Sequence, residues 1–471
     1  MTFNKQKKIL LLLSVPLSLC GFMMSTQVST PAAEKPNIIF ILADDLGYGD
    51  LGAYGQKKIK TPNLDKMAAN GMKFTDFYTG NTVCAPSRCA LMTGKHMGHA
   101  YIRGNGEIPL RAEDVIIAQK LKTAGYRTGM FGKWGLGVAG TPGAPNLKGW
   151  DSYFGLTHHV DAHFQQPDTL WQIKNKALVP VPNPAKAFAN ELFTQHALTF
   201  MQEKSEQPFF MYLAFTIPHA ELRGPQRVLN AYMDGSGKSV FAPEKPWKDG
   251  QHYGGQPNPK AAYAGLVTAV DDYVGLVLMK LEEMGMAENT IVMFASDNGT
   301  HLEGGRNLQD VEFFASSGPL KGVKRDMYDG GIRTPFLVQW KSKIAPASTT
   351  NHVGAFWDVA ATAYELAGLP ATKDTDGVSF VPTLLQKNQP KHEYLYWEFY
   401  ERGFDQAVRM GDWKAVKRSQ NGGKIELYNM KTDIQESKDV AAANPAVVSK
   451  MENVLKEAHV KSEIFPLAKK K

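Results

Sequence analysis

The sequence predicts an α/β fold: a large, doubly wound and mostly parallel sheet with helices on both faces, plus a small C-terminal antiparallel sheet with one packed helix. Strongly apolar runs occupy residues 37–43, 128–131, 209–217 and 290–295. Continuous apolar strands, unlike alternating ones, are typical of a parallel sheet that is buried on both faces. Helical patterns separate these runs, at residues 62–70, 115–124, 187–204 and 260–284. Strands and helices that alternate in this way indicate a doubly wound sheet.

After about residue 376 the pattern changes to short strands in which apolar and polar residues alternate. They cover residues 394–399, 406–409, 413–416 and 425–428. Such strands predict a small antiparallel sheet, and an amphipathic pattern at 445–459 predicts the helix that covers it. We therefore expect a main α/β domain over residues 34–375 and a smaller α+β subdomain over 376–471. Residues 223–259, rich in Gly, Pro and Lys, are expected to form a long loop or lid.

Residues 1–24 have the features of a secretory signal peptide. Three lysines precede an apolar run that ends at Leu19 and is too short to span a bilayer comfortably. This predicts a secreted or periplasmic protein with no membrane span. A lipid anchor at Cys20 is disfavoured, because the bulky Leu19 stands where a lipobox needs a small residue. Cleavage leaves only Cys84 and Cys89, which cannot form a disulfide framework, so stability must come from the core.

The composition is that of an ordinary globular chain, with 43% apolar and 21% charged residues among 471. The formal net charge is +7, and it falls to +4 without the three lysines of the leader. No basic stripe interleaved with aromatic residues accompanies this mild excess, so we expect no nucleic-acid partner. A small positive charge is compatible with a polyanionic substrate.

The pentapeptide from Cys84 to Arg88 combines several specific chemical features. An apolar, helix-forming stretch follows it, and Pro86 suits the first turn of a helix because it has no N–H group to satisfy. Cys84 is then expected at the positive end of the helix, where backbone donors and the helix dipole favour an anion. Arg88 lies one turn further on the same face and has a planar fork suited to an oxyanion. Cys89 is most simply a small buried hydrophobe.

Polar residues follow directly after four of the predicted strands. They are Asp44, Asp45, Lys133, His219, Asp297 and Asn298. In a doubly wound sheet, ligands bind outside the carboxyl ends of the strands, where these side chains would meet. A single Asp in this position is most simply a turn residue, but four strands that end alike predict a binding site.

Several motifs together resemble the formylglycine-dependent (type I) sulfatase family of the alkaline phosphatase superfamily, over nearly the whole mature chain. They are Ala43 to Gly47, Cys84 to Arg88 with Thr93-Gly94, Gly132-Lys133-Trp134, Ile217-Pro218-His219, Ser296 to Gly299, and Lys324 leading to Tyr328 to Arg333. In this family the cysteine is oxidised to formylglycine, an aldehyde that hydrates to a gem-diol, and one hydroxyl attacks sulfur. The resemblance implies a sulfuric ester hydrolase that depends on a formylglycine-generating maturation enzyme.

The resemblance also implies roles for individual residues. The implied metal ligands are Asp44, Asp45, Asp297, Asn298 and modified Cys84. The implied catalytic and sulfate-binding residues are Arg88, Lys133, His219 and Lys324, with Lys321 as a further substrate contact or a solvated neighbour. Because the metal site offers oxygen ligands only, calcium is the expected ion and magnesium the second choice. The imidazole of His219 is suited to protonating the departing alkoxide, since its ordinary pKa lies near neutrality.

The chain departs from the family pattern at Gly135, where a histidine that contacts the diol is usual. Another imidazole must then serve, or none does. His163 is the candidate for this role and for a substrate contact, and His158 and His159 are weaker candidates. His301, just past the strand that ends in metal ligands, is expected to contact the substrate.

The expected substrate is a sulfated oligosaccharide or polysaccharide, such as a sulfated galactan of the carrageenan type or a glycosaminoglycan. The leader, the expected lid and several aromatic residues suggest an extracytoplasmic enzyme that stacks sugar rings, although aromatics more often belong to the core. These aromatics are Trp150, Tyr153, Trp171, Trp397 and Tyr400. Two alternatives remain open: a phosphodiesterase or phosphonate hydrolase of the same superfamily, and a non-catalytic glycan-binding relative in which Cys84 is not converted.

Overall fold

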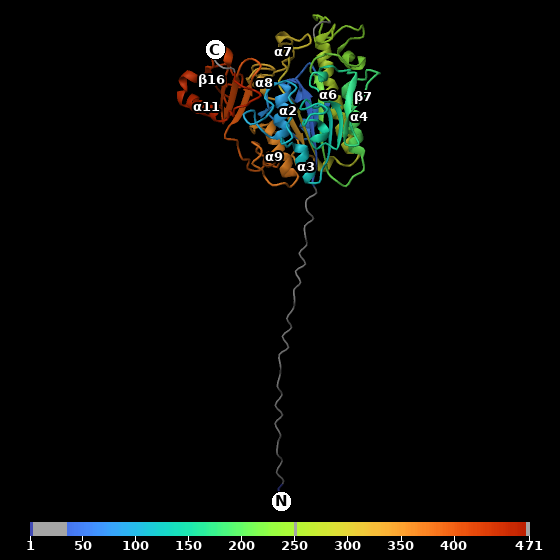
Figure 1. Cartoon of the computed structure of the whole chain (residues 1–471), viewed down its shortest axis with the longest axis vertical. Helices are drawn as coiled ribbons and strands as arrows, with labels where there is room; N and C mark the ends of the chain where they lie inside the picture. Colours follow the sequence, from blue (N-terminus) through green and yellow to red (C-terminus); the bar gives the residue numbers. More distant parts are fainter. Residues whose placement is uncertain (3–34, 249–251, 468–471) are drawn as a thin grey trace. The chain divides into compact units, whose positions relative to one another are not determined.

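The computed structural model describes residues 1–2, 35–248 and 252–467. Cys20 and all but the first two residues of the predicted signal peptide therefore lie outside the described residues. The chain from Lys35 onward forms one compact unit. Figure 1 traces this unit from blue at its first strand to red at its C-terminal sheet.

Ten strands of the described chain form the main sheet, in the order β11-β2-β10-β9-β1-β8-β4-β5-β6-β7. They are β1 Asn37–Asp44, β2 Met72–Phe74, β4 Arg127–Lys133, β5 Ser152–Leu156, β6 Thr169–Lys174, β7 Ala177–Pro182, β8 Phe209–Pro218, β9 Thr290–Ser296, β10 Phe336–Gln339 and β11 Ser348–Thr350. The central strands β9, β1, β8, β4 and β5 run parallel. The predicted sheet of parallel central strands is confirmed.

Helices cover both faces of this sheet, as the sequence predicts. The helices of the described chain are α1 Pro62–Ala69, α2 Cys84–Thr93, α3 Ile117–Thr123, α4 Ala189–Gln202, α5 Gln226–Leu229, α6 Pro259–Glu283, α7 Leu308–Phe314, α8 Asp329–Ile332, α9 Phe356–Leu366, α10 Val381–Leu384 and α11 Pro445–Glu457. Of these, α11 covers the C-terminal sheet instead. In β1, Ile38, Phe40 and Leu42 lie in a core with α2, α3 and α9 (Figure 1). Ile39 and Ile41 lie in a second core with α1, α4 and α6. Alternate side chains of one strand therefore serve two cores, which explains its continuous apolar sequence.

The edges of the sheet differ from the prediction, because antiparallel strands extend it on both sides. β10 pairs antiparallel with β9 and β2, and β6 pairs antiparallel with β5 and β7. The sequence does not reveal β6 and β7, because they are half-exposed and β7 contains Pro180 and Pro182. Proline is confined to the edges of sheets, where its missing N–H group breaks no ladder.

The C-terminal sheet is antiparallel in the order β13-β14-β15-β16, as predicted. Its strands are β13 Leu395–Phe399, β14 Asp405–Met410, β15 Trp413–Lys417 and β16 Ile425–Asn429. A separate two-stranded sheet pairs β3 Phe77–Tyr78 with β12 Gly354–Ala355. One face, which includes Tyr396, packs under α11 against Met451 and Leu455. The other face, which includes Trp397, completes the core shared with α2 and α9. The small sheet therefore has no solvent-facing apolar side.

Three of the aromatics that the sequence places near sugars belong to the core instead. Trp150, Tyr153 and Trp397 are buried in the core next to α2 and α9. Trp150 stacks on Phe210 of β8 at a centroid distance of 5.6 Å. These rings fill space between the sheet and its helices, so they cannot stack on a glycan.

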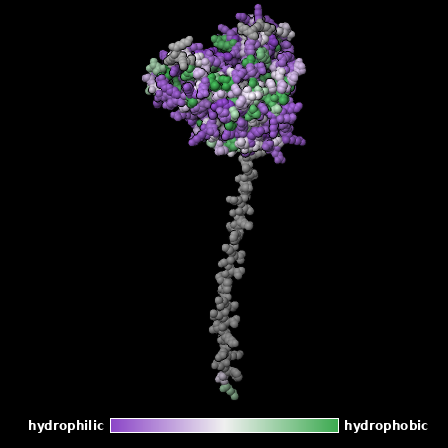
Figure 2. Space-filling view, viewed as in Figure 1, coloured by the Kyte–Doolittle hydropathy of each residue, from purple (hydrophilic) through white to green (hydrophobic). Residues whose placement is uncertain are grey.

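The apolar helix α6 is a core helix. It is the only helix in residues 35–248 and 252–467 that is long and apolar enough to cross a membrane, and 67% of its apolar window is buried inside the protein. On the face seen in Figure 2, hydrophilic residues predominate and hydrophobic residues form small scattered groups.

The described parts of the expected long loop, residues 223–248 and 252–259, are mostly irregular. They contain the short helix α5 and a 3-10 turn at Asn230–Tyr232. Two isolated bridges, Met233 with Ser239 and Trp247 with Gln256, fold the segment back on itself.

Candidate active site

Cys84 is the first residue of α2, where the sequence predicts it. Its side chain is buried, and Sγ lies 3.5 Å from Asp44 Oδ1. Arg88, one turn further along, is also buried and donates from Nε and Nη2 to Asp297 Oδ2 at 3.0 and 2.8 Å. The start of α2 therefore faces two carboxylates, one from the end of β1 and one from the segment after β9.

The predicted metal ligands meet at the carboxyl edge of the sheet. Asp44 ends β1 and Asp45 follows it, while Asp297 and Asn298 follow the parallel neighbour β9. The Asp45 N–H group donates to Asp297 Oδ1 at 3.1 Å, and Asn298 Nδ2 donates to Asp45 Oδ1 at 2.5 Å. All four residues are fully buried. Neighbouring parallel strands end at the same edge, which is why residues so distant in sequence come into contact.

A cation lies beside each of the three carboxylates. Lys133 Nζ is 2.6 Å from Asp44 Oδ2, and Lys324 Nζ is 2.8 Å from Asp45 Oδ2. The third pair joins Arg88 to the carboxylate that follows β9. Buried charges are tolerated only when they are paired in this way. The predicted sulfate-binding cations and the predicted metal ligands therefore form one cluster.

Burial and the neighbouring charges shift the pKa values of three side chains in this cluster. Burial raises the pKa of Asp44, but Lys133 and His219 outweigh it and hold the pKa well below its usual value. Burial and the Asp44 carboxylate raise the pKa of Asp297 to about 7. Burial also raises the pKa of the Cys84 thiol well above its usual value. Unmodified Cys84 is therefore a neutral thiol, which is a weak nucleophile.

The cluster has the ligands that a hard metal cation requires. Asn298 Oδ1 is buried and has no hydrogen-bond partner among the residues that the structure describes. Asp44, Asp45, Cys84 and His219 offer ligand atoms within 4.8 Å of one another. A buried oxygen without a partner costs about 1–3 kcal/mol, a cost that a bound cation would remove. Three carboxylates and an orphaned amide oxygen fit calcium or magnesium.

His219 lies just after β8, beside the carboxylates. Its Nε2 is 3.4 Å from both Asp45 Oδ2 and Glu303 Oε2, and its Nδ1 contacts the Ala220 carbonyl. Burial and the Lys324 charge lower the pKa of His219 to about 3. A bound sulfate group would add negative charge beside the ring and raise that pKa.

Two further histidines lie next to His219. The ring of His163, in the 3-10 turn Asp161–His163, stacks on that of His219 with centroids 4.4 Å apart. His301 Nε2 lies 3.1 Å from the Pro218 carbonyl, and its Nδ1 accepts from a backbone N–H group. His301 is fully buried, whereas His163 is partly exposed. The proposed substrate contacts of both residues stay predictions.

Another imidazole lies beside Gly135, where the family histidine is absent. A Cβ atom at this glycine would lie 3.5 Å from the Cβ of His159. The His159 Nδ1 is 2.5 Å from Glu107 Oε1. Burial and the Lys133 charge lower the pKa of His159. The pairing of β4 with β5 brings the two positions together, which is why the sequence alone favours His163 instead.

Lys321 is placed against the C-terminal sheet. Its Nζ contacts the Tyr428 hydroxyl at 3.3 Å and the Glu436 carbonyl at 3.1 Å. It also lies 3.9 Å from the centroid of the Tyr328 ring. These are the contacts of a residue that docks the small sheet, and the structure does not bring Lys321 to the carboxylate cluster.

Glu303 belongs to the site and is missed by sequence reasoning. Its Oε2 accepts from the Tyr253 hydroxyl at 2.8 Å and lies 3.7 Å from Lys324 Nζ. Its Oε1 accepts from Arg325 Nη1 at 2.6 Å. Because the same carboxylate lies near His219, it links that imidazole to the cations. Its only signal in the sequence is a position shortly after Asn298.

Comparisons with known proteins show which proteins this chain is similar to. The sulfatase family model matches residues 36–369, and the model of the N-sulphoglucosamine sulphohydrolase C-terminal region matches residues 323–461. The chain is 32% identical over 416 residues to N-acetylgalactosamine-6-sulfatase of Rattus norvegicus, which covers 82% of this chain and 72% of that protein. It is 31% identical over 429 residues to arylsulfatase A of Homo sapiens, and this match covers 84% of this chain and 77% of that protein.

A solved structure shares the whole architecture. The crystal structure of Ps i-CgsB in complex with k-i-k-neocarrahexaose matches with a TM-score of 0.76 and 28% identity, covering 91% of this chain and 94% of that one. The match to the sulfatase family model spans more than half of the chain and includes Cys84, Arg88 and the carboxylate cluster. The chain therefore belongs to the sulfatase family and is a sulfuric ester hydrolase.

Proposed function

We propose that the protein removes sulfate from a sulfated glycan, with formylglycine derived from Cys84 as the nucleophile and calcium held by the adjacent carboxylates. The position of Cys84 carries this proposal. It begins α2, lies 3.5 Å from Asp44, and is influenced by the charges of Lys133 and Lys324. A nucleophile at this point lies beside one cluster that contains both cations for an oxyanion and acids for a metal.

The nucleophile requires conversion, because the neutral Cys84 thiol is poorly suited to attack a sulfate ester. A maturation enzyme would convert it to formylglycine, whose hydrate carries two hydroxyl groups. One hydroxyl oxygen bonds to sulfur while the bond from sulfur to the sugar oxygen breaks. The second hydroxyl then loses its proton and re-forms the aldehyde, which expels sulfate, and water restores the diol.

The cations of the site stabilise the transferring group. Sulfate ester cleavage resembles phosphoryl transfer in its need for positioned positive charge. Arg88, Lys133 and Lys324 supply that charge from three different elements. A bound calcium ion would lower the pKa of the nucleophile and accept charge from a sulfate oxygen. Calcium suits this irregular oxygen set better than magnesium, which demands near-ideal octahedral geometry and usually keeps several waters.

His219 is proposed to protonate the departing sugar oxygen. His219→Ala is then expected to lower kcat by about 10²–10⁴-fold on a sulfated sugar, the usual range for a general acid. An activated aryl sulfate leaves without protonation, so its kcat should fall far less. Measuring both substrates with the same protein preparation tests this difference. Equal losses on the two substrates would assign His219 to binding or folding instead.

The diol proton needs an acceptor in place of the family histidine, and His159 and His163 are the candidates. We expect His159→Ala to lower kcat on an aryl sulfate by about 10²–10⁴-fold, because its ring lies beside Gly135 and the Lys133 charge. His163→Ala should follow the leaving-group dependence of His219→Ala, because the two rings stack.

The exposed His99 offers a matched control for these two variants. Its side chain is 41% exposed and pairs with Asp376. His99→Ala should turn over aryl sulfate at the parent rate. A leaving-group-independent loss in His163→Ala that exceeds the loss in His159→Ala would give the role to His163, as the sequence favours.

The relatives support a glycan substrate. One acts on N-acetylgalactosamine 6-sulfate by name, and another was crystallised with a neocarrahexaose. We propose a sulfated galactan of the carrageenan type or a glycosaminoglycan as the substrate class. The features of residues 1–24 support a secreted or periplasmic location.

The proposal is tested by assaying sulfate release from carrageenan and glycosaminoglycan oligosaccharides beside an aryl phosphodiester and an aryl phosphonate. Sulfate release is expected, and faster cleavage of either phosphorus ester would favour the related hydrolases. Mass spectrometry of the Cys84 peptide should show a loss of about 18 mass units on conversion. Glycan binding by a protein from its native host that keeps the thiol would favour a non-catalytic relative.

A further inference from the structure

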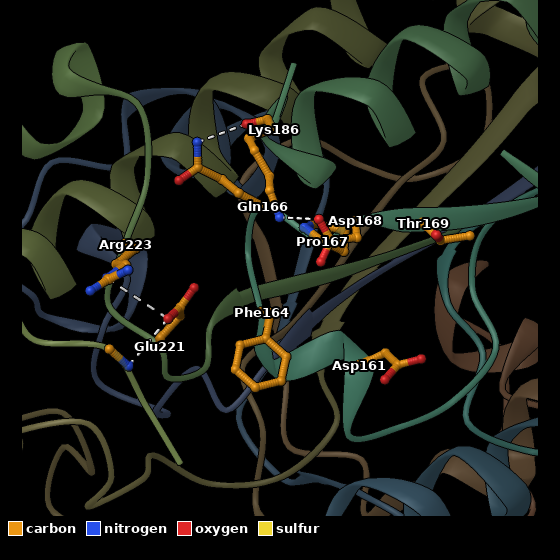
Figure 3. Close-up of a pocket in the computed structure, with 10 residues that line it drawn as sticks. Asp161, Phe164, Gln166, Pro167, Asp168, Thr169, Lys186, Glu221 and Arg223 are labelled. Atoms are coloured by element: carbon orange, nitrogen blue, oxygen red, sulfur yellow. Dashed lines mark hydrogen bonds and ion pairs between the residues drawn. The ribbon is translucent and has the colours of Figure 1, made fainter. Parts of the chain in front are cut away.

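A cavity of about 850 Å³ opens beside the His163 turn. Its volume lies within the range of about 300–1,000 Å³ that is usual for ligand pockets. The lining includes Phe164, Gln166, Asp168, Lys186, Glu221 and Arg223, with Asp161 as a third acid. No lining residue belongs to the carboxylate cluster. Figure 3 shows Arg223 with Glu221 on one side of the open space, Gln166 with Lys186 and Asp168 on another, and Phe164 below.

Each cation of this cavity is already paired with an acid. Three carboxylates and two cations line it, which gives a formal charge of −1. Lys186 pairs with Asp168, and Arg223 Nε lies 3.8 Å from Glu221 Oε2. Because each cation has an acid beside it and the formal charge is negative, the cavity does not favour a second sulfate group. The cations of the reacting site are also paired with acids, but a calcium ion bound there would add two positive charges.

The remaining groups suit an uncharged, hydroxyl-rich ligand. Gln166 Nε2 donates to the Lys186 carbonyl at 2.8 Å, and its amide oxygen points into the open space in Figure 3. The Asp168 side chain is 85% exposed, so its carboxylate can accept from a hydroxyl. Phe164 supplies an aromatic ring at the same cavity. Carboxylate and amide acceptors beside an aromatic ring are groups that can bind a sugar through its hydroxyls and its apolar face.

A row of rings connects the cavity to the reacting site. The Phe164 ring lies 5.3 Å from that of His252, whose Nε2 is 2.9 Å from His163 Nδ1. His163 in turn stacks on His219. The backbone gives the same connection, because the Glu221 N–H group donates to the His163 carbonyl at 2.9 Å. The cavity therefore borders the turn whose histidine ring contacts His219 of the reacting site.

We propose that this cavity is a subsite for an uncharged sugar unit that neighbours the sulfated unit of the substrate. The proposal rests on the proposed desulfation of a glycan, and it narrows the substrate class. The protein selects a sulfated unit whose neighbour carries free hydroxyls. It discriminates against glycans in which that neighbour is sulfated as well.

Binding to the Cys84→Ser protein tests the subsite independently of turnover. Three kinds of probe are titrated by calorimetry. The first is a galactose sulfate, and the second is the two disaccharides in which an unsulfated galactose is linked to one or the other side of that unit. The third is the same two disaccharides with a second sulfate on the neighbouring galactose. We expect the singly sulfated disaccharide to bind most tightly. Phe164→Ala should weaken this binding about tenfold, which corresponds to an aromatic contact of ~1.4 kcal/mol, and should bring the disaccharide close to the monosaccharide.

A second variant tests the charge balance. Asp168→Asn removes an exposed acid and leaves Lys186 without its partner. The ratio between the Kd values of the doubly and the singly sulfated disaccharide should then fall about tenfold. This change corresponds to the loss of one charge repulsion of ~1.4 kcal/mol. Gln195→Ala, an exposed change on α4, is the matched control and should bind all probes as the parent does.

The outcomes separate the subsite from the proposed function. Equal binding of monosaccharide and disaccharides, absence of binding, or an unchanged preference in Phe164→Ala would overturn the subsite even if the Cys84 protein releases sulfate. If the Cys84 protein releases no sulfate from any glycan, while the preference and its loss in Phe164→Ala are observed, the subsite stands and the proposed activity fails.

Discussion

Cys84→Ser is expected to abolish turnover and to leave substrate binding intact. In this motif a serine would not become the diol through the proposed maturation, and a sulfate ester formed on serine would need a separate hydrolysis step. The loss in kcat should be at least about 10⁴-fold, as for removal of the nucleophile in other hydrolases. Lys133 and Lys324 remain in place, so the Kd of a sulfated oligosaccharide should stay within a few-fold of that of the unconverted parent. Both quantities are measured on one preparation, by aryl sulfate turnover and by calorimetry.

Cys89→Ser is the matched control, because Cys89 lies in the same helix and is fully buried in the core. The two thiols are not joined in the structure. A buried hydroxyl in an apolar setting should cost about 1–3 kcal/mol of unfolding free energy, visible as a lower Tm. Turnover should survive. Equal loss of turnover in both variants would show that the two cysteines act together, and would contradict the proposed nucleophile.

Removal of the proposed calcium ion is expected to abolish turnover without unfolding the main sheet. The proposed ligands lie at the ends of β1 and β9, whereas the strands themselves are held by two apolar cores. Without the ion, the nucleophile loses the charge that lowers its pKa. Far-UV circular dichroism should be unchanged, while Tm should fall because an ion that binds only the folded state stabilises it.

The measurement compares chelated, dialysed protein with the same sample after calcium is restored. Calcium should recover the full rate, and magnesium should recover less of it. Elemental analysis establishes that the chelated sample is metal-free. Full activity in a sample without metal would contradict the metal assignment, whereas irreversible unfolding on chelation would place the ion in the core of the fold.

The central part of the fold could be predicted from sequence because its signal is strong. Residues such as Ile39 and Phe40 of β1 face different cores, so the strand has no polar residue between Asn37 and Asp44 and stands out as a continuous apolar run. The edge strand β7 has the opposite character. Its exposed positions and Pro180 resemble a loop, and only pairing with β6 makes it a strand. Whether a segment becomes an edge strand depends on pairing with another strand, and the local sequence pattern does not show this pairing.

The residues of the site also differ in whether the sequence could predict them. Asp44 and Asp297 could be predicted to meet, because both close parallel strands that share an edge. Glu303 could not, because it is a single acid in a loop, and only its contacts with His219 and Lys324 reveal its place. His159 could not be preferred over other histidines for a similar reason. Its position beside Gly135 depends on the register between β4 and β5.

The burial of Cys84 has a consequence for how the protein is made. Only 2% of the residue is exposed, and the groups around it include Asp297 and Lys324, which are synthesised much later. A maturation enzyme that must reach Sγ cannot do so once β9 has joined the sheet. Under the proposed conversion, the cysteine must therefore be modified before the chain has folded around it. Folding would then bury a residue that has already been converted to formylglycine. A molecule that folds before this conversion would remain inactive.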